Sequence, residues 1–384
     1  MLLSFKAELK PNNKQVTPQG QHCGVARHAH KWGNAVILET LKLRESDKSV
    51  KLPSAIDLHK RLVADVKSEH LWYYESSKAS PQKALADVRS AWDRCFKKAS
   101  KLPRFKKKGK SHDSVYLEQG TKAKPGISND GQPVKISKIC WIRLAEPLPV
   151  KAVHNCVGPT ADQWFIAIKH EIDRPTVADS RPSVGVDVGI KSLAVARDGK
   201  IFENPKAELR TRLRLKGLQR GVSKKVKGSK NRAKAVSKLG KLHAIVANIR
   251  KNAIHKLTHH LAKNHGLVKI EDLSIKAFLK NHKLAGAADC GMYEFRRQLE
   301  YKSEKFSSQL VSIARMFPSS QNLLLQLGNH RHKMPLKDRV YVCPDCGHTE
   351  DRDLNAAKNI EGWFEGIYIP MRSDQTARRS SKSL

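Results

Sequence analysis

The stretch from Ser183 to Lys200, SVGVDVGIKSLAVARDGK, places one acid inside an apolar strand pattern. The residues up to Asp187 predict a buried strand, and SLAVA predicts a second strand after a turn that Gly189 permits. A charged side chain inside an apolar strand is costly unless it is paired or bound to a metal ion. Asp187 is therefore a candidate metal ligand, although a single aspartate in a strand is more often structural than functional.

Two further acids follow the same pattern. Glu271 ends the apolar run LVKIED, and Asp353 opens the helical pattern DLNAAKNI. Taken singly, each acid could be a helix cap or part of a surface ion pair, and the same holds for Asp272 and Asp351. Taken together, three acids in one α/β segment can converge on one edge of a sheet. Carboxylates are the ligands that Mg²⁺ prefers, and two such ions about 4 Å apart can promote phosphodiester hydrolysis.

The overall charge points to a polyanionic partner. Lys and Arg total 73 against 36 Asp and Glu, which gives a net charge of +37 over 384 residues. Nucleic acid is the expected partner, because lysines and arginines release counterions from phosphates; a membrane surface is the remaining alternative. The sequence contains no run of eighteen apolar residues, so it predicts no membrane span. The seven cysteines are scattered except for one pair, which favours a reducing compartment, and we expect a cytoplasmic protein.

The periodicity changes along the chain and suggests several domains. The first strand lies within residues 1–13, three helical patterns fill 14–100, and alternating strands fill 101–178. We expect the first helix to begin at Thr17 with Pro18 in its first turn. Ser54 and Asp57 form a capping box for the second helix, and Ser80 opens the third. RPTVADSRPS then reads as a linker, and a basic helical stretch from 205 to 264 breaks near GVSKKVKGSK.

The ordered motifs resemble a known family. GVDVGIKSLAVARDG, KIEDLSIK, EFRRQLEYK, MFPSSQ and CPDCGHTEDRDLNAAKNI resemble the RuvC-type nuclease core of the TnpB family, transposon-encoded proteins ancestral to type V CRISPR effectors. Upstream, ARHAHKWGNAV, SPQKALADV, PRFKKKG and IRLAE resemble the recognition and wedge portions of the same family. The resemblance covers nearly the whole chain.

The resemblance implies an RNA-guided DNA endonuclease with an α/β, RNase H-like (RuvC) core. Its catalytic and Mg²⁺-binding acids fall on Asp187, Glu271 and Asp353, with Asp351 the less favoured alternative to the last, and two Mg²⁺ ions (or Mn²⁺) are the implied cofactor. A guide RNA from the transposon end and double-stranded target DNA are the implied partners, with the basic 205–265 face and the FKKKGK loop following their phosphates. The implied domains are a wedge strand (1–13), a helical recognition domain (14–100), a β-barrel-like wedge domain (101–178), the nuclease core (179–316), a degenerate zinc ribbon (317–350), the last core segment (351–370) and a disordered tail (371–384).

The zinc ribbon departs from the family pattern. Cys343 and Cys346 form one CxxC pair, but Leu324 and Leu327 stand where the family carries the other pair. Three interpretations compete. The ribbon has lost its metal, His330 and His332 replace the missing thiolates, or a partner chain or RNA orders the loop. We favour loss of zinc, because leucine cannot bind a metal ion and both positions changed together.

Other functions remain possible from the sequence. The main alternative is an RNA-guided DNA-binding protein with impaired nuclease activity, which acts by occupying its target. The motif His28-Ala29-His30 superficially fits a single-strand transposase, but that motif requires a strand beside a nucleophilic tyrosine, and here the pattern is helical. A junction-resolving enzyme would share the core but not the added helical and β-rich regions. We expect the protein to associate with the nucleoid when bound to DNA; the sequence predicts no oligomeric state.

Overall fold

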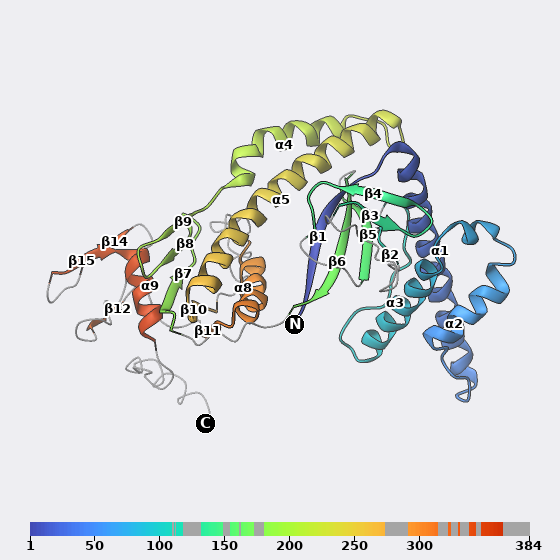
Figure 1. Cartoon of the computed structure of the whole chain (residues 1–384), viewed down its shortest axis with the longest axis horizontal. Coiled ribbons are helices and arrows are strands. Elements are labelled where there is room, and N and C mark those ends of the chain that lie inside the picture. Colours follow the sequence, from blue (N-terminus) through green and yellow to red (C-terminus); the bar gives the residue numbers. More distant parts are fainter. Residues whose placement is uncertain are drawn as a thin grey trace, which may run out of the picture. The chain divides into compact units, whose positions relative to one another are not determined.

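The computed structural model of the chain divides into two compact units, Met1–Asp173 and Arg174–Leu384 (Figure 1). The division falls at the start of the predicted linker. The model describes residues 1–109, 111, 113–117, 132–148, 154–160, 163–172, 180–272, 291–313, 322–323, 329–330, 338–342 and 347–363. The predicted tail at 371–384 lies outside the described residues.

Unit 1 contains a six-stranded antiparallel sheet in the order β2-β5-β6-β1-β4-β3. The N-terminal strand β1 lies in the middle of this sheet, where it pairs with both β4 and β6. The wedge strand expected at the N-terminus thus joins strands more than a hundred residues away. The barrel-like closure of this region stays a prediction, because β2 and β3 are the edges of the described sheet. The strands are β1 (Leu2–Lys10), β2 (Val115–Leu117), β3 (Val134–Ile136), β4 (Cys140–Leu144), β5 (His154–Thr160) and β6 (Gln163–Glu171).

The helices of unit 1 are α1 (Asn13–Ser46), α2 (Ala55–Arg61) and α3 (Ala79–Phe96), with a short 3₁₀ helix at Leu71–Glu75. The capping box predicted for α2 is confirmed, since Ser54 and Asp57 exchange side-chain and backbone hydrogen bonds. Helices α1 and α3 pack together, and the buried Trp92 indole donates to Asn34 Oδ1 at 2.8 Å. One core cluster joins these helices to the sheet of the same unit.

The expected start of the first helix is wrong. Helix α1 begins at Asn13, and Pro18 lies inside it. The reason is a capping box one turn earlier, in which Asn12 Oδ1 accepts from the Gln15 N–H and Gln15 Oε1 accepts from the Asn12 N–H, both at 3.0 Å. Pro18 is the sixth residue of α1, where it removes one backbone hydrogen bond, and the helix continues through it.

Unit 2 is built on a five-stranded mixed sheet in the order β11-β10-β7-β8-β9. Strands β7, β10 and β11 are parallel, while β8 and β9 run antiparallel to their neighbours. The predicted α/β unit is therefore confirmed. The strands are β7 (Ser183–Asp187), β8 (Ser192–Ala196), β9 (Ile201–Glu203), β10 (Leu267–Glu271) and β11 (Gln309–Ile313), with the small pairs β12 (Asn322–Leu323) with β13 (Asn329–His330) and β14 (Val340–Val342) with β15 (Thr349–Asp351).

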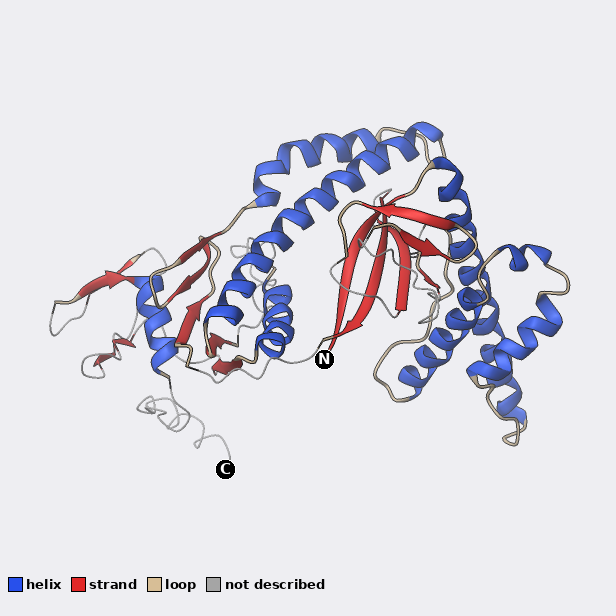
Figure 2. Ribbon diagram, in the orientation of Figure 1, coloured by secondary structure: helices blue, strands red, loops and turns tan. Residues whose placement is uncertain are grey.

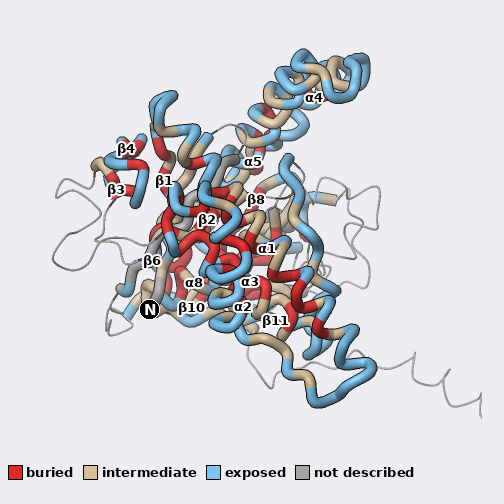
Figure 3. Tube along the Cα trace, turned by 90° about the vertical axis from the view of Figure 1, so that its right-hand side faces the viewer, coloured by how far each residue is buried: buried red, intermediate tan, exposed pale blue. Residues whose placement is uncertain are grey.

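Helices α4 (Ala207–Ser223), α5 (Lys230–Asn264), α8 (Met292–Phe306) and α9 (Arg352–Gly362) complete the described part of unit 2 (Figure 2). The predicted break in the basic helical stretch is confirmed, because it separates α4 from α5. The C-terminal half of α5 and α8 bury Leu257 and Leu299 in the same core as the strands, while α4 is mostly exposed (Figure 3). Among the described helices none is long and apolar enough to cross a membrane.

Helix α9 lies unusually close to β7, and Gly185 makes this possible. A methyl group built on Gly185 would lie 2.1 Å from the Ala357 carbonyl oxygen and 2.3 Å from the Glu361 backbone nitrogen. Those atoms belong to the helix backbone, so they cannot move aside as a flexible side chain would. A glycine at this position therefore fixes how closely α9 approaches the sheet.

We expect Gly185→Ala to lower the free energy of unfolding by about 1–3 kcal/mol, because the added methyl group forces α9 away from β7. Thermal melting of the purified protein measures the loss. The matched control is Gly217→Ala in α4, where an added methyl group meets nothing within 4 Å; alanine there should leave stability unchanged or slightly higher. Equal melting temperatures for the two variants would contradict the close packing.

Candidate active site

Strands β7 and β10 bring Asp187 and Glu271 to the same edge of the sheet. The two strands are parallel neighbours, with Val186 opposite Ile270, and each acid is the last residue of its strand. The residues just before them are buried, while both acids are only partly buried. The apolar strands thus end in two carboxylates at the carboxyl edge, where α/β sheets place their functional groups.

Helix α9 supplies the third acid, and its cap separates two candidates. The Asp351 carboxylate is the N-cap and accepts from the Asp353 and Leu354 backbone N–H groups at 2.9 and 3.1 Å. Asp353 lies in the first turn, where its nearest cation is Arg339 at 3.9 Å. Asp351 is thus occupied by the helix, and Asp353 is the acid whose charge acts on Asp187.

Burial and the charges of two neighbouring carboxylates disfavour ionisation of Asp187. Burial raises the pKa of Asp187 from its ordinary 3.8 to about 7, and the negative charges of Glu271 and Asp353 add to this rise. Arg352 and a backbone hydrogen bond from Val188 oppose it without cancelling it. Neighbouring carboxylates disfavour each other's ionised form, so such a site favours uptake of a cation or a proton.

Asp272 has a different role from Glu271. Its carboxylate accepts from Arg296 Nη1 of α8 at 2.6 Å, and its backbone N–H donates to the Ile313 carbonyl at 3.0 Å. It does not contribute to the raised pKa of Asp187. Of these two neighbouring acids, Asp272 is therefore part of a surface ion pair, and Glu271 is the one whose charge acts on Asp187.

The C-terminal half of α9 is anchored by residues that the sequence analysis missed. The Glu361 carboxylate accepts from Ser183 Oγ and from Arg197 Nη1, the latter at 2.7 Å. Lys269, buried within β10, donates to the Glu361 and Trp363 carbonyls at 2.6 Å each. The sequence feature that could have revealed this contact is the lysine inside the apolar strand LVKIE. Its side chain donates hydrogen bonds to the last carbonyls of α9.

The acids offer the hard oxygen donors that suit Mg²⁺, and their mutual repulsion is what a bound cation would relieve. Within the described part of the chain, however, no three Asp, Glu, His or Cys side chains are grouped closely enough to hold a metal ion. The carboxylate oxygens therefore suit Mg²⁺ chemically, whereas the distances between these side chains do not yet suit a bound ion. The zinc candidates Cys343, Cys346 and His332, together with Leu324 and Leu327, lie outside the described residues; of His330 only the backbone pairing of β13 is described.

The structure does not meet the requirement of the single-strand transposase alternative, which needs its two histidines on a strand. His28 and His30 lie on helix α1, as the periodicity predicts, and not on a strand. His28 Nδ1 is 2.8 Å from the hydroxyl of Tyr73, but burial raises the pKa of that tyrosine. A buried tyrosine that resists ionisation is a poor nucleophile.

The chain is similar to known proteins over most of its length. Residues 165–282 match a family described as "Probable transposase", and residues 293–360 match the Cas12f1-like TNB domain. A Streptomyces pristinaespiralis protein named "Putative RNA-guided DNA endonuclease" is 36% identical over 332 residues, 82% of this chain and 81% of its own length. An Escherichia coli K12 protein with the same name and the suffix InsQ is 28% identical, over 94% and 91% of the two chains. The CRISPR-associated endodeoxyribonuclease Cas12f1 of Sulfoacidibacillus thermotolerans is 23% identical over about half of each chain (52% and 50%).

These matches and the mixed sheet with acids at its strand ends define a RuvC-containing protein of the transposase and Cas12f group. More particularly, the chain belongs to the TnpB family. The resemblance noted from the sequence motifs is thereby confirmed, and it covers both units.

The raised pKa of Asp187 predicts a stability effect in metal-free protein. A carboxyl whose folded pKa is raised destabilises the fold once pH exceeds its unfolded value, and the penalty grows until pH passes the folded value of about 7. We expect Asp187→Asn to stabilise the protein in EDTA by up to about 4 kcal/mol at pH 8, and by less than half of that at pH 5. Thermal melting at both pH values measures it.

The control for this prediction is Asp198→Asn, an exposed turn acid of the same unit whose side chain accepts from the Lys200 N–H. Asparagine keeps that hydrogen bond, so we expect no gain at either pH. A gain at Asp187 that does not depend on pH would contradict the raised pKa of this carboxyl.

Proposed function

We propose that this protein is an RNA-guided DNA endonuclease that cuts target DNA at a single RuvC-type site in its RNase H-like core, with Mg²⁺ as cofactor. One observation carries the proposal. A partly buried carboxyl at a strand end, Asp187, is held against the charges of Glu271 and Asp353 with its pKa raised to about 7. Such an arrangement is unfavourable for the fold alone and is typical of sites that bind cations.

We assign the metal to Asp187, Glu271 and Asp353, which are not grouped closely enough in the structure to hold an ion by themselves, so substrate phosphate oxygens and water would supply the remaining ligands. When bound, two Mg²⁺ (or Mn²⁺) ions would activate an attacking water and neutralise charge on the scissile phosphate. Asp187 and Glu271 are fixed by the register of β7 and β10, so their spacing does not depend on loops. Asp353 is oriented by the Asp351 cap at one end of α9 and by Lys269 and Glu361 at the other.

The basic helices of unit 2 support a role in holding nucleic acid. A cavity of about 440 Å³ between α4 and α5 is lined by Arg212, Lys216, His243 and Arg250, with Glu208 as its only acid. Lysines and arginines along these helices suit backbone contacts to a guide RNA and its heteroduplex, in which base pairing reads the sequence. We propose that the protein binds a guide RNA from the transposon end and double-stranded target DNA. We also propose that it acts in the cytoplasm, on DNA of the nucleoid.

The catalytic assignment predicts a matched pair of variants at one helix end. We expect Asp353→Asn to abolish cleavage of matched target DNA by the purified ribonucleoprotein in Mg²⁺, while guided binding stays intact. Asp351→Asn should keep cleavage within a fewfold, because asparagine caps a helix about as well as aspartate. Cleavage and gel-shift assays on a target library randomised beside the match measure both activities.

Asp187→Ala and Glu271→Ala should behave like Asp353→Asn. Loss of guided DNA binding in Asp187→Ala would overturn its assignment as a metal ligand. If the wild-type ribonucleoprotein binds its target and does not cut, the alternative of an RNA-guided binder with impaired nuclease activity is correct, and Leu324 and Leu327 become the first positions to restore.

The missing cysteine pair predicts a zinc-poor protein. We expect elemental analysis of the purified chain to find well below one zinc per molecule, because two thiolates alone bind zinc weakly. The double variant Leu324→Cys/Leu327→Cys should take up about one zinc per chain, since it restores four thiolates. One tightly held zinc in the wild-type protein would instead favour His330 and His332 as ligands, and His330→Ala/His332→Ala would then release it.

A further inference from the structure

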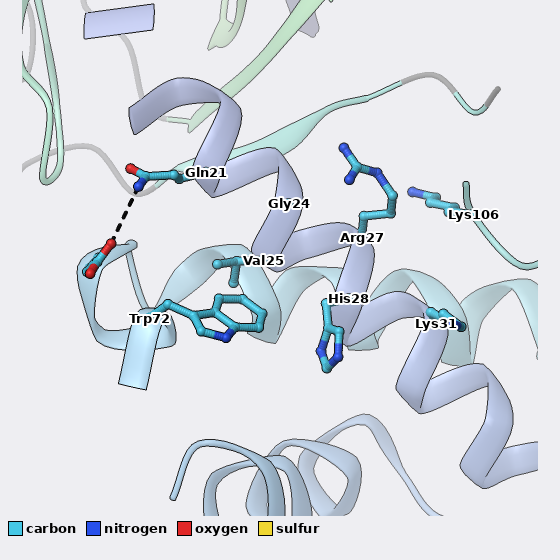
Figure 4. A pocket seen from close by; sticks show the side chains of 9 residues that line it. Gln21, Gly24, Val25, Arg27, His28, Lys31, Trp72 and Lys106 are labelled. Carbon is cyan, nitrogen blue, oxygen red and sulfur yellow. Dashed lines mark hydrogen bonds between the residues drawn. The ribbon is translucent and has the colours of Figure 1, made fainter. Parts of the chain in front are cut away.

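Unit 1 contains a cavity of about 430 Å³ that the nuclease chemistry does not use (Figure 4). Its floor is one face of α1, where Gly24, Val25 and His28 succeed one another, and Trp72 of the 3₁₀ helix forms a wall. Figure 4 shows Val25 above the Trp72 ring and the His28 side chain pointing down from α1 beside them. The cavity is comparable in size to a single nucleotide and lies within one unit.

The aromatic wall is held by three neighbouring rings and stays partly exposed. The Trp72 ring lies 4.4 Å from the Tyr73 ring at an interplanar angle of 23°, His28 meets it edge-on at 5.3 Å, and the His70 ring lies 5.6 Å away at 32°. Tyr73 is buried, and its hydroxyl is hydrogen-bonded to His28. Trp72 itself is 39% exposed. A fixed and partly exposed indole can stack on another flat ring without losing much conformational freedom.

The rim of the cavity is basic. Arg27, Lys31 and Lys106 line it against a single acid, Glu75, whose carboxylate accepts from Gln21. Within the described residues neither Lys31 nor Lys106 has an ion-pair partner. Arg27 is oriented by two hydrogen bonds to Asp113 at 3.0 and 2.8 Å, which occupy one side of its guanidinium. The two lysines are therefore the cations available to a phosphate.

Gly24 keeps the cavity open. Glycine inside a helix costs about 1 kcal/mol relative to alanine, and a methyl group built there meets no atom within 4 Å. Packing within the protein therefore does not require this glycine. A side chain at this position would project into the cavity, so its absence leaves room for a ligand.

We propose that this cavity binds one unpaired nucleotide, whose base stacks on Trp72 and whose phosphate meets Lys31 and Lys106. A flat, apolar wall beside unpartnered cations suits a base with its phosphate better than it suits a peptide or a lipid. The nucleotide would come either from the guide RNA or from a DNA strand. The inference builds on the proposed RNA and DNA partners but not on cleavage.

Two glycines one helical turn apart provide the test. Gly24→Leu fills the cavity, while Gly20→Leu places the same side chain on the same helix at an exposed position with open space around it. Both changes favour the helix, so both proteins should fold, which thermal melting verifies. Binding is measured in EDTA so that cleavage plays no part. One arm uses RNA transcribed from the DNA downstream of the coding sequence, and the other uses matched target DNA with the assembled ribonucleoprotein.

We expect Gly24→Leu and Trp72→Ala to weaken binding about tenfold or more in one arm, and Gly20→Leu and Trp72→Phe to stay near wild type. The arm that weakens identifies the source of the nucleotide. The salt dependence of binding should be unchanged in Gly24→Leu, whereas Lys31→Ala should lower its slope by about one. Photocrosslinking of 4-thiouridine RNA or 4-thiothymidine DNA should label the peptide that carries Trp72.

Equal affinities for Gly24→Leu and Gly20→Leu in both arms, with no crosslink to Trp72, would overturn the pocket and leave the proposed nuclease standing. Failure of the wild-type chain to bind either RNA or target DNA would overturn the proposed function together with the pocket.

Discussion

The contact on which the nuclease site depends is the backbone-to-backbone approach of α9 to β7 at Gly185. A helix normally stands off a sheet by the thickness of its side chains, and here one missing Cβ removes that spacing. Because α9 is only 11 residues long, its position is determined by a few contacts: Gly185 in the middle, Lys269 and Glu361 at the C-terminal end, and the Asp351 cap at the N-terminal end. Asp353 reaches the strand-end acids only through that placement.

The same placement creates an electrostatic penalty that the rest of unit 2 must offset. Burial and the charges of Glu271 and Asp353 disfavour the ionised form of Asp187, whereas the core beneath it joins apolar strand residues such as Val186 and Ile270 to apolar residues of α5 and α8. Rigid strands hold the first two acids, and a capped helix holds the third. Acids on flexible loops would move apart to relieve the repulsion, whereas these strands and the capped helix hold them in place.

The sequence predicted the elements better than it predicted their contacts. The strands ending at Asp187 and Glu271, the break between α4 and α5 and the capping box at Ser54 all follow from periodicity and local hydrogen bonds. The start of α1 differs from the predicted one, because the Asn12–Gln15 capping box begins the helix before Thr17 and Pro18. By pattern alone Asp351 and Asp353 suit a helix start equally well, and only the family resemblance favours Asp353 as the site residue. The observed hydrogen bonds show that Asp351 is the cap.

Long-range contacts explain what remained hidden. Lys269 stands in the sequence as an unexplained charge inside an apolar strand, and its purpose appears only when the carbonyls of residues 361 and 363 lie within 2.6 Å. Gly24 is similar: a glycine within a helix signals a cost, but the sequence cannot say that Trp72, nearly fifty residues later, forms a wall opposite it. In both places one residue departs from the pattern of its own helix or strand, and the residues that explain it lie far away in the sequence. Such local exceptions are the places where a sequence points to function before its structure is known.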